Sequence, residues 1–300
     1  MAVTTITSKQ TRRRHRNNPY LWIAPAMLLF GLFTLLPLAG GLAIGFFSWN
    51  GFQAARWVGL DNFTRVFHDQ GFWQSLEHNV IYAVGTVVGK LVLAVCLAVL
   101  LNRSLRGQTF FRTVLFMPVV MSFVVVGLIW NWIYNYNFGL LNTVLGWVGL
   151  GGWKQDWLGN TSFALGALIV VDIWKWFGFH MVIYLAGLQS IPNELYESAR
   201  IDGANSRQSF RYITLPLLVP VTMINLLLAT AGAFTVFDLV YVMTDGGPVN
   251  ATDVAMVHIY TQAFQFNQFG YAAAMSYVLL VLISAVSLVL MRLLRQERYF

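Results

Sequence analysis

Six long apolar segments constrain this 300-residue chain more than any other feature of its sequence. They cover residues 21–47, 79–101, 113–134, 162–188, 217–243 and 270–294. A helix of about 20 apolar residues is long enough to cross the hydrocarbon core of a bilayer. Only 10% of the residues are charged, whereas a soluble domain carries roughly a quarter. The sequence therefore predicts an all-α membrane protein with six transmembrane helices.

The first apolar segment follows a polar, basic stretch at residues 1–18, as the apolar region of a cleaved signal peptide also would. A signal peptide, however, has an apolar region of only about 7 to 15 residues, and the segment at 21–47 is much longer. We therefore expect residues 1–18 to form a cytoplasmic tail and residues 19–300 to form one transmembrane domain.

The positive charges indicate how the chain is oriented. Fourteen of the 19 Lys and Arg residues lie in four short segments, at 9–16, 103–112, 200–211 and 292–298. With six spans these segments all fall on one side, and basic loops are typical of the cytoplasmic side. The opposite loops contain only Arg56, Arg65 and Lys154. We therefore expect both termini in the cytoplasm, and the clustering explains the net charge of +7 without a nucleic-acid partner.

A polar segment, ELYESARIDGANSRQSFRYITLP at residues 194–216, interrupts the apolar pattern between the fourth and fifth spans. Pro192 suits the first turn of a helix, where its missing N–H costs nothing, and Glu194 suits the positive helix N-terminus. Gly203 can adopt the left-handed conformation that ends a helix. The pattern predicts two short helices that project into the cytoplasm, although an ordinary solvated loop is the simpler alternative.

This segment resembles a known motif, the EAA pattern EAA-x3-G-x9-I-x-LP of ABC importer permeases. The matching residues are Glu197-Ser198-Ala199, Gly203 and Ile213-Thr214-Leu215-Pro216. Ser198 departs from the motif, since it replaces the first alanine with another small residue. The runs LAGLQSIPNELYESARIDGA, TDGGP and GYAAAMS are similar to the carbohydrate-uptake branch, the maltose and glycerol-3-phosphate type.

The resemblance implies a type I ABC importer permease of MetI-like architecture in the cytoplasmic (inner) membrane of a bacterium or archaeon. Its expected partners are an ABC ATPase dimer, a second homologous permease subunit, membrane lipid and an extracytoplasmic sugar-binding protein. Residues 190–216 would form the coupling loop. The residues expected to contact the ATPase are Glu197, Ala199, Asp202 and Gly203.

The chain lacks a GxxxxGK[ST] phosphate loop. We therefore expect ATP and magnesium to bind to the partner ATPase subunits, and this chain to be a transport subunit without a cofactor rather than an enzyme. Cys96 is the single cysteine, so an intrachain disulfide and a cysteine metal cluster are both excluded. No metal site is predicted.

Two ionisable residues in the fourth span, Asp172 and Lys175, are three positions apart and therefore share a helix face. Ionisable groups are costly inside a membrane and are by default functional candidates. One interpretation is an internal ion pair between them. The other is that these residues, with Trp176 and Phe179, line a translocation pathway, because aromatic faces with a few polar groups suit a sugar.

Further polar residues lie in the other spans. Ser122, which follows Pro118 in the third span, is a candidate pathway residue. The resemblance adds Asp238 in the fifth span. We expect Lys90 to face the bundle in a structural role, and His180 to be a packing residue rather than a ligand.

Two other classes of function remain as alternatives. A secondary transporter or channel could use Asp172, Lys175 and Asp238 as a proton or ion relay. An intramembrane enzyme is the weakest alternative, since the sequence contains neither HExxH nor GxSxG. The polar segment favours the importer, because a secondary transporter needs no projecting cytoplasmic helix. The sequence does not specify which sugar is carried.

Overall fold

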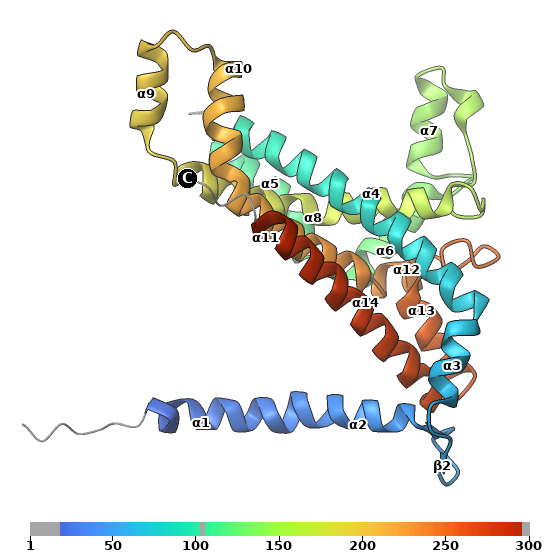
Figure 1. Cartoon of the computed structure of the whole chain (residues 1–300). Helices are drawn as coiled ribbons and strands as arrows, with labels where there is room; N and C mark the ends of the chain where they lie inside the picture. The colour runs from blue at the N-terminus through green and yellow to red at the C-terminus, as the bar shows by residue number, and fades with distance from the viewer. Residues whose placement is uncertain (1–18, 103–105, 296–300) are drawn as a thin grey trace, which may run out of the picture.

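The computed structural model describes residues 19–102 and 106–295, and helices dominate this part of the chain. Five helices in this part of the chain are long and apolar enough to cross a membrane, and the number is six if a bent helix pair is counted as one span. The predicted all-α membrane fold is therefore confirmed (Figure 1). The predicted tail at 1–18, residues 103–105 with the basic Arg103, and residues 296–300 with the basic Arg298 lie outside the described residues.

The spans are formed by long helices, some with a π-helical turn. They are α1 (Pro19–Phe30), η1 (Gly31–Leu35) and α2 (Leu36–Gly45); α4 (Gln70–Leu101); α5 (Gln108–Val120) and α6 (Phe123–Tyr134); α8 (Ala164–Gln189); α10 (Ser206–Ser209), η3 (Phe210–Thr214) and α11 (Leu215–Phe234); and α14 (Phe269–Arg295).

Shorter elements connect the spans. They are β1 (Phe47–Ser48) and β2 (Arg56–Trp57), which pair antiparallel, α3 (Asp61–His68), α7 (Leu140–Trp147), η2 (Gly151–Trp153), α9 (Asn193–Ile201), α12 (Asp238–Met243), α13 (Ala255–Tyr260) and η4 (Thr261–Gln265).

Within the described residues, helices α4 and α8 form the most extensive helix–helix contact. Gly85 and Gly89 are four residues apart on α4, and the side chains of Ile169 and Ile173 of α8 pack directly over them. A Cβ atom at Gly89 would lie only 2.2 Å from Ile173 Cδ1. Because lipid is as apolar as a leucine side chain, helices in membranes associate through such small-residue contacts. The spacing of the two glycines thus fixes α8 against α4.

The third span is not the single helix over 113–134 that the sequence predicts. Helices α5 and α6 meet at a bend of 100°. The chain is extended at Met121 and Ser122, and Ser122 caps α6 because its Oγ accepts a hydrogen bond from the Val125 amide at 3.3 Å. Hydropathy averages over about 20 residues, so it cannot detect a break of two apolar or small residues.

The fifth span also differs from its predicted limits at 217–243. It begins earlier, because helix runs continuously over Ser206–Phe234. It ends earlier as well, because the helix stops at Phe234 and Asp238 begins the separate helix α12. Pro216 lies inside this continuous helix, just after the π-helical turn η3, so it does not mark the start of the span.

The two ends of the bundle carry different elements. In Figure 1 the first turn of α1, the last turn of α14 and the helices α9 and α10 all lie toward the left, while the β1–β2 hairpin, α3 and α7 lie toward the right. Both described ends of the chain therefore lie at the end where α9 projects, as an even number of spans requires.

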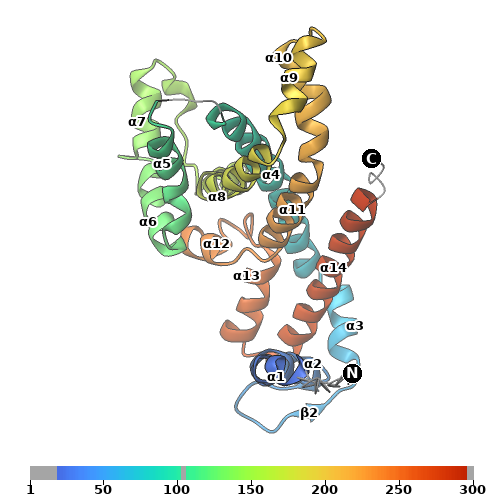
Figure 2. The same cartoon turned by 90° about the vertical axis from the view of Figure 1, so that its left-hand side faces the viewer.

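The first span stands apart from the other helices (Figures 1 and 2). Its most apolar window of 18 residues is 0% buried inside the chain. Contact with the rest of the molecule is made through α2, where a Cβ atom at Gly45 would lie 3.5 Å from the Ala274 backbone of α14. A long apolar surface therefore faces away from the bundle.

Candidate functional site

A cavity of about 400 Å³ lies among the membrane helices and is lined by α4, α6, α8, α11 and α12. Four of the six predicted pathway residues line it, namely Asp172, Trp176, Phe179 and Asp238. The lining residues also include Lys90, Phe123, His180, Leu228, Thr235 and Phe237. The tertiary structure thus brings together residues from four separate spans.

Asp172 forms an ion pair, but not with Lys175. Its Oδ2 lies 2.5 Å from the Nζ of Lys90 on α4, and the two side chains are 5% and 4% exposed. The interpretation of an Asp172–Lys175 pair is therefore wrong. Residues three apart on a helix share a face, yet α4 packs so closely on α8 that its lysine reaches Asp172. Lys90 faces the bundle, as expected, and besides pairing with Asp172 it also lines the cavity.

Lys175 points to the bend between α5 and α6 instead. Its Nζ donates hydrogen bonds to the carbonyl oxygens of Pro118, Val119 and Met121, at 3.3, 3.4 and 2.5 Å. The last carbonyls of a helix lack intrahelical partners and carry partial negative charge, so an ammonium group stabilises them. Lys175 does not line the cavity, and it therefore does not join the predicted pathway face.

Ser122 is likewise used at the bend, as the N-cap of α6, and does not line the cavity. The residue after it, Phe123, does line the cavity, and its ring lies 6.2 Å from that of Trp176. Trp176 in turn lies 5.9 Å from the ring of Phe179. The three rings form a continuous aromatic wall, to which the bend contributes Phe123.

His180 lines the cavity and is also joined to α11. Its Nδ1 lies 2.7 Å from the Oδ1 of Asn225, and the two residues are 3% and 0% exposed. The prediction that His180 only packs is thus incomplete, because the ring combines a buried hydrogen bond with a place in the cavity wall. No local signal marks it, since Asn225 is 45 residues away in the sequence.

The projecting segment at the opposite end of α11 follows the predicted helix–turn–helix pattern. Helix α9 ends at Gly203, which has φ +81°. The Ala204 amide donates to the Ala199 carbonyl at 2.8 Å, and the Gly203 amide donates to the Arg200 carbonyl at 3.1 Å. These two bonds form a Schellman motif, so the predicted left-handed glycine cap is confirmed.

The start of each helix differs slightly from prediction. Pro192 precedes α9 as its N-cap rather than lying in its first turn. Asn205 and Gln208 form a reciprocal capping box at the start of α10. Because α10 continues into η3 and α11, the second helix of the projection is the cytoplasmic extension of the fifth span rather than a separate element.

The predicted coupling residues lie on the surface of this projection. Glu197, Asp202 and Gly203 are exposed, and Ala199 is half-buried. A hydrogen bond of 2.9 Å between the Tyr196 hydroxyl and the Thr214 Oγ1 ties α9 to the base of α11. The acidic side chains are therefore free to contact another protein, while the helix that carries them is attached to a span that lines the cavity.

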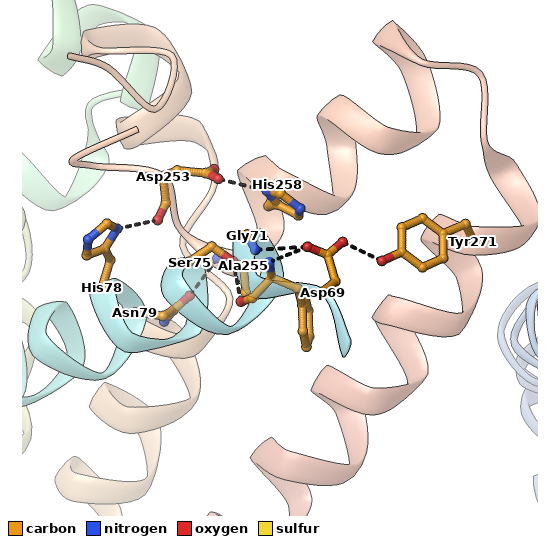
Figure 3. Close-up of polar contacts among 10 residues, drawn as sticks. Asp69, Gly71, Ser75, His78, Asn79, Asp253, Ala255, His258 and Tyr271 are labelled. Carbon is orange, nitrogen blue, oxygen red and sulfur yellow. Dashed lines mark hydrogen bonds and ion pairs between the residues drawn. The ribbon is translucent and has the colours of Figure 1, made fainter. Parts of the chain in front are cut away.

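A second polar cluster, which sequence reasoning missed, lies at the other end of the bundle (Figure 3). Asp69 caps α4 by accepting hydrogen bonds from the amides of Gly71 and Phe72 at 2.9 and 3.2 Å, and the Tyr271 hydroxyl of α14 donates to it. His258 Nδ1 lies 2.8 Å from Asp253 Oδ2. The Ala255 amide of α13 donates to the Oδ1 of Asn79 on α4 at 3.3 Å, so the cluster ties α4, α13 and α14 together at this end.

Two opposing effects act on the pKa of Asp69. Burial raises it, but the hydrogen bonds from Tyr271, Phe72 and Gly71 and the nearby His258 outweigh burial and hold the pKa below its ordinary value. The carboxylate is therefore ionised at neutral pH, as an N-cap that accepts several hydrogen bonds requires. In the sequence Asp69 lies in a segment rich in aromatic residues, and nothing in that segment predicts that its carboxylate caps α4 and binds Tyr271.

Comparison with known proteins gives consistent results. Residues 90–297 match the family model of the binding-protein-dependent transport system inner membrane component. The chain is 39% identical to the probable ABC transporter permease protein YurN of Bacillus subtilis, over 91% of this chain and 94% of that protein. It is 34% identical to the lactose transport system permease protein LacF of Rhizobium radiobacter, over 94% and 95% of the two chains.

A solved structure also matches over nearly the whole chain. It is described as a bacterial ABC transporter involved in the import of the acidic polysaccharide alginate. The TM-score is 0.83 at 25% sequence identity, and the match covers 94% of this chain and 96% of the other. The expected MetI-like permease architecture is thus confirmed.

Proposed function

Since the chain belongs to the family of inner membrane components of binding-protein-dependent transport systems, we propose that it is the permease subunit of an ATP-driven importer for a sugar or sugar derivative. The observation that carries the proposal is the cavity of about 400 Å³ in which an aromatic wall faces polar side chains. A sugar has apolar ring faces and hydroxyl groups at its rim, so it can use both kinds of contact.

The proposed pathway residues are those that line the cavity, namely Asp172, Trp176, Phe179 and Asp238, with Phe123 and His180 added. Lys175 and Ser122 contribute indirectly, because they stabilise the α5–α6 bend that places Phe123 in the cavity wall. A proton relay through Asp172, Lys175 and Asp238 finds no support in this geometry, since Lys175 is turned toward backbone carbonyls.

The proposed partners follow from the surfaces that the chain leaves open. An ABC ATPase dimer would dock on α9 and contact Glu197, Ala199, Asp202 and Gly203, and it would bind the ATP and magnesium. A second homologous permease would complete the pathway and cover part of the exposed first span. An extracytoplasmic binding protein would deliver the sugar at the end that carries the β1–β2 hairpin and α7.

Helix α9, on which the ATPase is proposed to dock, is connected to the cavity through α11. A displacement of α9 would reach α11 through the Tyr196–Thr214 hydrogen bond. Because Leu228, Ala229 and Gly232 of α11 line the cavity, movement of α11 would change the shape of the cavity. We propose that alternating access in this chain uses this route, in the inner membrane of a bacterium or archaeon with both termini in the cytoplasm.

The test is transport by the complete importer in proteoliposomes. The chain is co-expressed with a candidate partner permease and ATPase, and uptake of radiolabelled sugar is measured with the binding protein present. The expected result is uptake that requires ATP inside the vesicles and stops when the ATPase is omitted. Uptake driven by a proton gradient in the absence of the ATPase would refute the proposal.

A further inference from the structure

We infer that the cavity wall of this chain selects uncharged, hydroxyl-rich sugars and excludes sugars that carry carboxylate or phosphate groups. The inference rests on the proposed function and specifies the substrate class of the same cavity. It depends on two features of the cavity wall. The first is the charge balance of its ionisable side chains, and the second is whether its hydrogen-bonding groups donate or accept.

The first feature is the charge balance. Lys90 and Asp172 neutralise one another, with 2.5 Å between Nζ and Oδ2 and almost no exposure of either side chain. Lys175 does not line the cavity itself, because three carbonyl oxygens at the bend hold its ammonium group, which lies over the rings of Phe123 and Trp176 at 4.7 and 5.2 Å. Asp238 is exposed, and within the described residues no Lys, Arg or His lies within ion-pair distance of it. The unpaired charge of the lining is therefore negative.

The second feature is the direction of hydrogen bonding at His180. The Oδ1 of Asn225 is an acceptor, so the Nδ1 of His180, at 2.7 Å, carries the proton. In a neutral imidazole the other nitrogen, Nε2, is then an acceptor. Nε2 has no partner in the described part of the chain, and the ring lines the cavity. The buried asparagine thus fixes His180 in the form that accepts a hydrogen bond from a ligand.

These two features make the cavity wall a hydrogen-bond acceptor toward a ligand. Asp238 and His180 both present acceptors, and a sugar hydroxyl can donate to each of them. A carboxylate or phosphate group can only accept, so it would leave these groups unpaired and would also be repelled by the Asp238 carboxylate. The aromatic wall of Phe123, Trp176 and Phe179 supplies contacts to ring faces that neutral and acidic sugars share, so it does not discriminate. Selection by charge is therefore assigned to Asp238 and His180.

The inferred preference for uncharged sugars differs from the substrate of the solved protein that this chain resembles in fold. That protein belongs to a transporter described as importing an acidic polysaccharide. A common helical framework fixes where the cavity lies, whereas the side chains that line it determine which ligand charge it tolerates. The overall resemblance therefore does not imply an acidic substrate here.

The experiment measures ligand binding by the purified complete importer in detergent, without the binding protein, so that only the membrane cavity selects. The probes are neutral trisaccharides of glucose, galactose and mannose, and the corresponding trisaccharide of each uronic acid. Affinity is measured by isothermal titration at low salt, since screening weakens charge effects. We expect at least one neutral trisaccharide to bind about tenfold or more tightly than its uronate, a ratio equivalent to 1.4 kcal/mol.

Two variants test the residues assigned. Asp238→Asn removes the negative charge and should reduce the ratio between neutral and acidic affinities by about tenfold. Asp61→Asn, an exposed residue of α3 outside the cavity, makes the same change of net charge and should leave the ratio unaltered. His180→Phe keeps the ring but removes the acceptor, so it should weaken neutral binding by about tenfold, and His180→Gln should restore part of it.

The outcomes distinguish this inference from the proposed function. The inference would be overturned if the uronates bind as tightly as the neutral sugars, or if none of the three neutral trisaccharides binds. It would also be overturned if Asp238→Asn leaves the ratio of neutral to acidic affinities unchanged. ATP-driven uptake is measured after the same importer has been reconstituted into proteoliposomes with the binding protein. An importer that is active but prefers uronates refutes only the inference, whereas a preparation without ATP-driven sugar uptake refutes the proposed function.

Discussion

The Lys90–Asp172 pair of the cavity wall and the acidic residues of the α9 projection are placed in opposite ways. In the cavity wall Lys90 and Asp172 are buried and paired across two helices. On the projection Glu197 and Asp202 are exposed. Buried charges are tolerated only when a neighbour compensates them, whereas exposed charges remain available to a partner. The first region therefore depends on its own packing, while the second is proposed to depend on a protein that docks there.

The largest effect on stability is expected from Lys90→Met. This change leaves the Asp172 carboxylate buried without its counter-ion, and breaking such a pair costs about 3 to 5 kcal/mol. We expect a strong fall in the temperature at which the detergent-solubilised protein unfolds, measured by intrinsic fluorescence. The double variant Lys90→Met/Asp172→Leu should recover most of the loss. A double variant that is no more stable than the single one would show that the ion pair is not what Lys90 contributes.

A smaller effect is expected from Lys175→Met, which leaves the carbonyls at the α5–α6 bend without their ammonium donor. The loss of a hydrogen-bonded charged group costs about 1 to 3 kcal/mol. Because the bend places Phe123 in the cavity wall, sugar affinity should fall as well. Lys175→Arg retains the charge and is the matched control. Wild-type stability and affinity in Lys175→Met would remove the role assigned to this lysine.

A still smaller effect is expected from Gly203→Ala. With φ at +81°, any residue with a Cβ atom is strained, and the cost is about 1 kcal/mol. Gly166→Ala in α8 is the matched control, because nothing lies within 4 Å of a Cβ atom there. Since Gly203 ends α9, we expect a lower ratio of transport to ATP hydrolysis in the complete importer. An unchanged ratio would mean that the geometry of the cap does not matter for coupling.

The smallest effect on stability, and a large effect on transport, is expected from Glu197→Arg. The side chain is exposed, so unfolding should occur at the wild-type temperature. If an ATPase docks on α9, reversal of the charge should abolish ATPase stimulation by sugar and binding protein. Glu194→Arg, also exposed and in the same helix, serves as the control. Normal stimulation in Glu197→Arg would contradict the proposed coupling role.

Sequence reasoning was most successful where the property in question is local. The left-handed cap at Gly203 follows from glycine alone, and the apolar segments follow from the length that a bilayer requires. It failed at the third span, because two residues with extended backbone, Met121 and Ser122, change the helix direction without changing hydropathy. The predicted limit of the fifth span was wrong for the same reason. Helix α11 stops at Phe234 within an apolar stretch, so hydropathy does not show where the helix ends.

The candidate site shows the same division. Asp172, Trp176 and Phe179 could be identified because they lie on one face of one helix, a relation that sequence spacing encodes. The partners of these residues could not. Lys90 is 82 positions from Asp172, and Asn225 is 45 positions from His180. Helical periodicity carries no information about which residue of another helix lies opposite.

The sequence by itself determined that the chain is a helical membrane protein with long apolar segments, and that it carries a capped helix resembling the EAA motif. Each of these properties depends on hydrophobicity or on the backbone preference of a few adjacent residues. Only the tertiary structure decided that Lys90 rather than Lys175 pairs with Asp172, and that Lys175 stabilises a bend. Side chains from distant segments meet only after close packing, such as that of Gly89 against Ile173, has fixed the distance between helices.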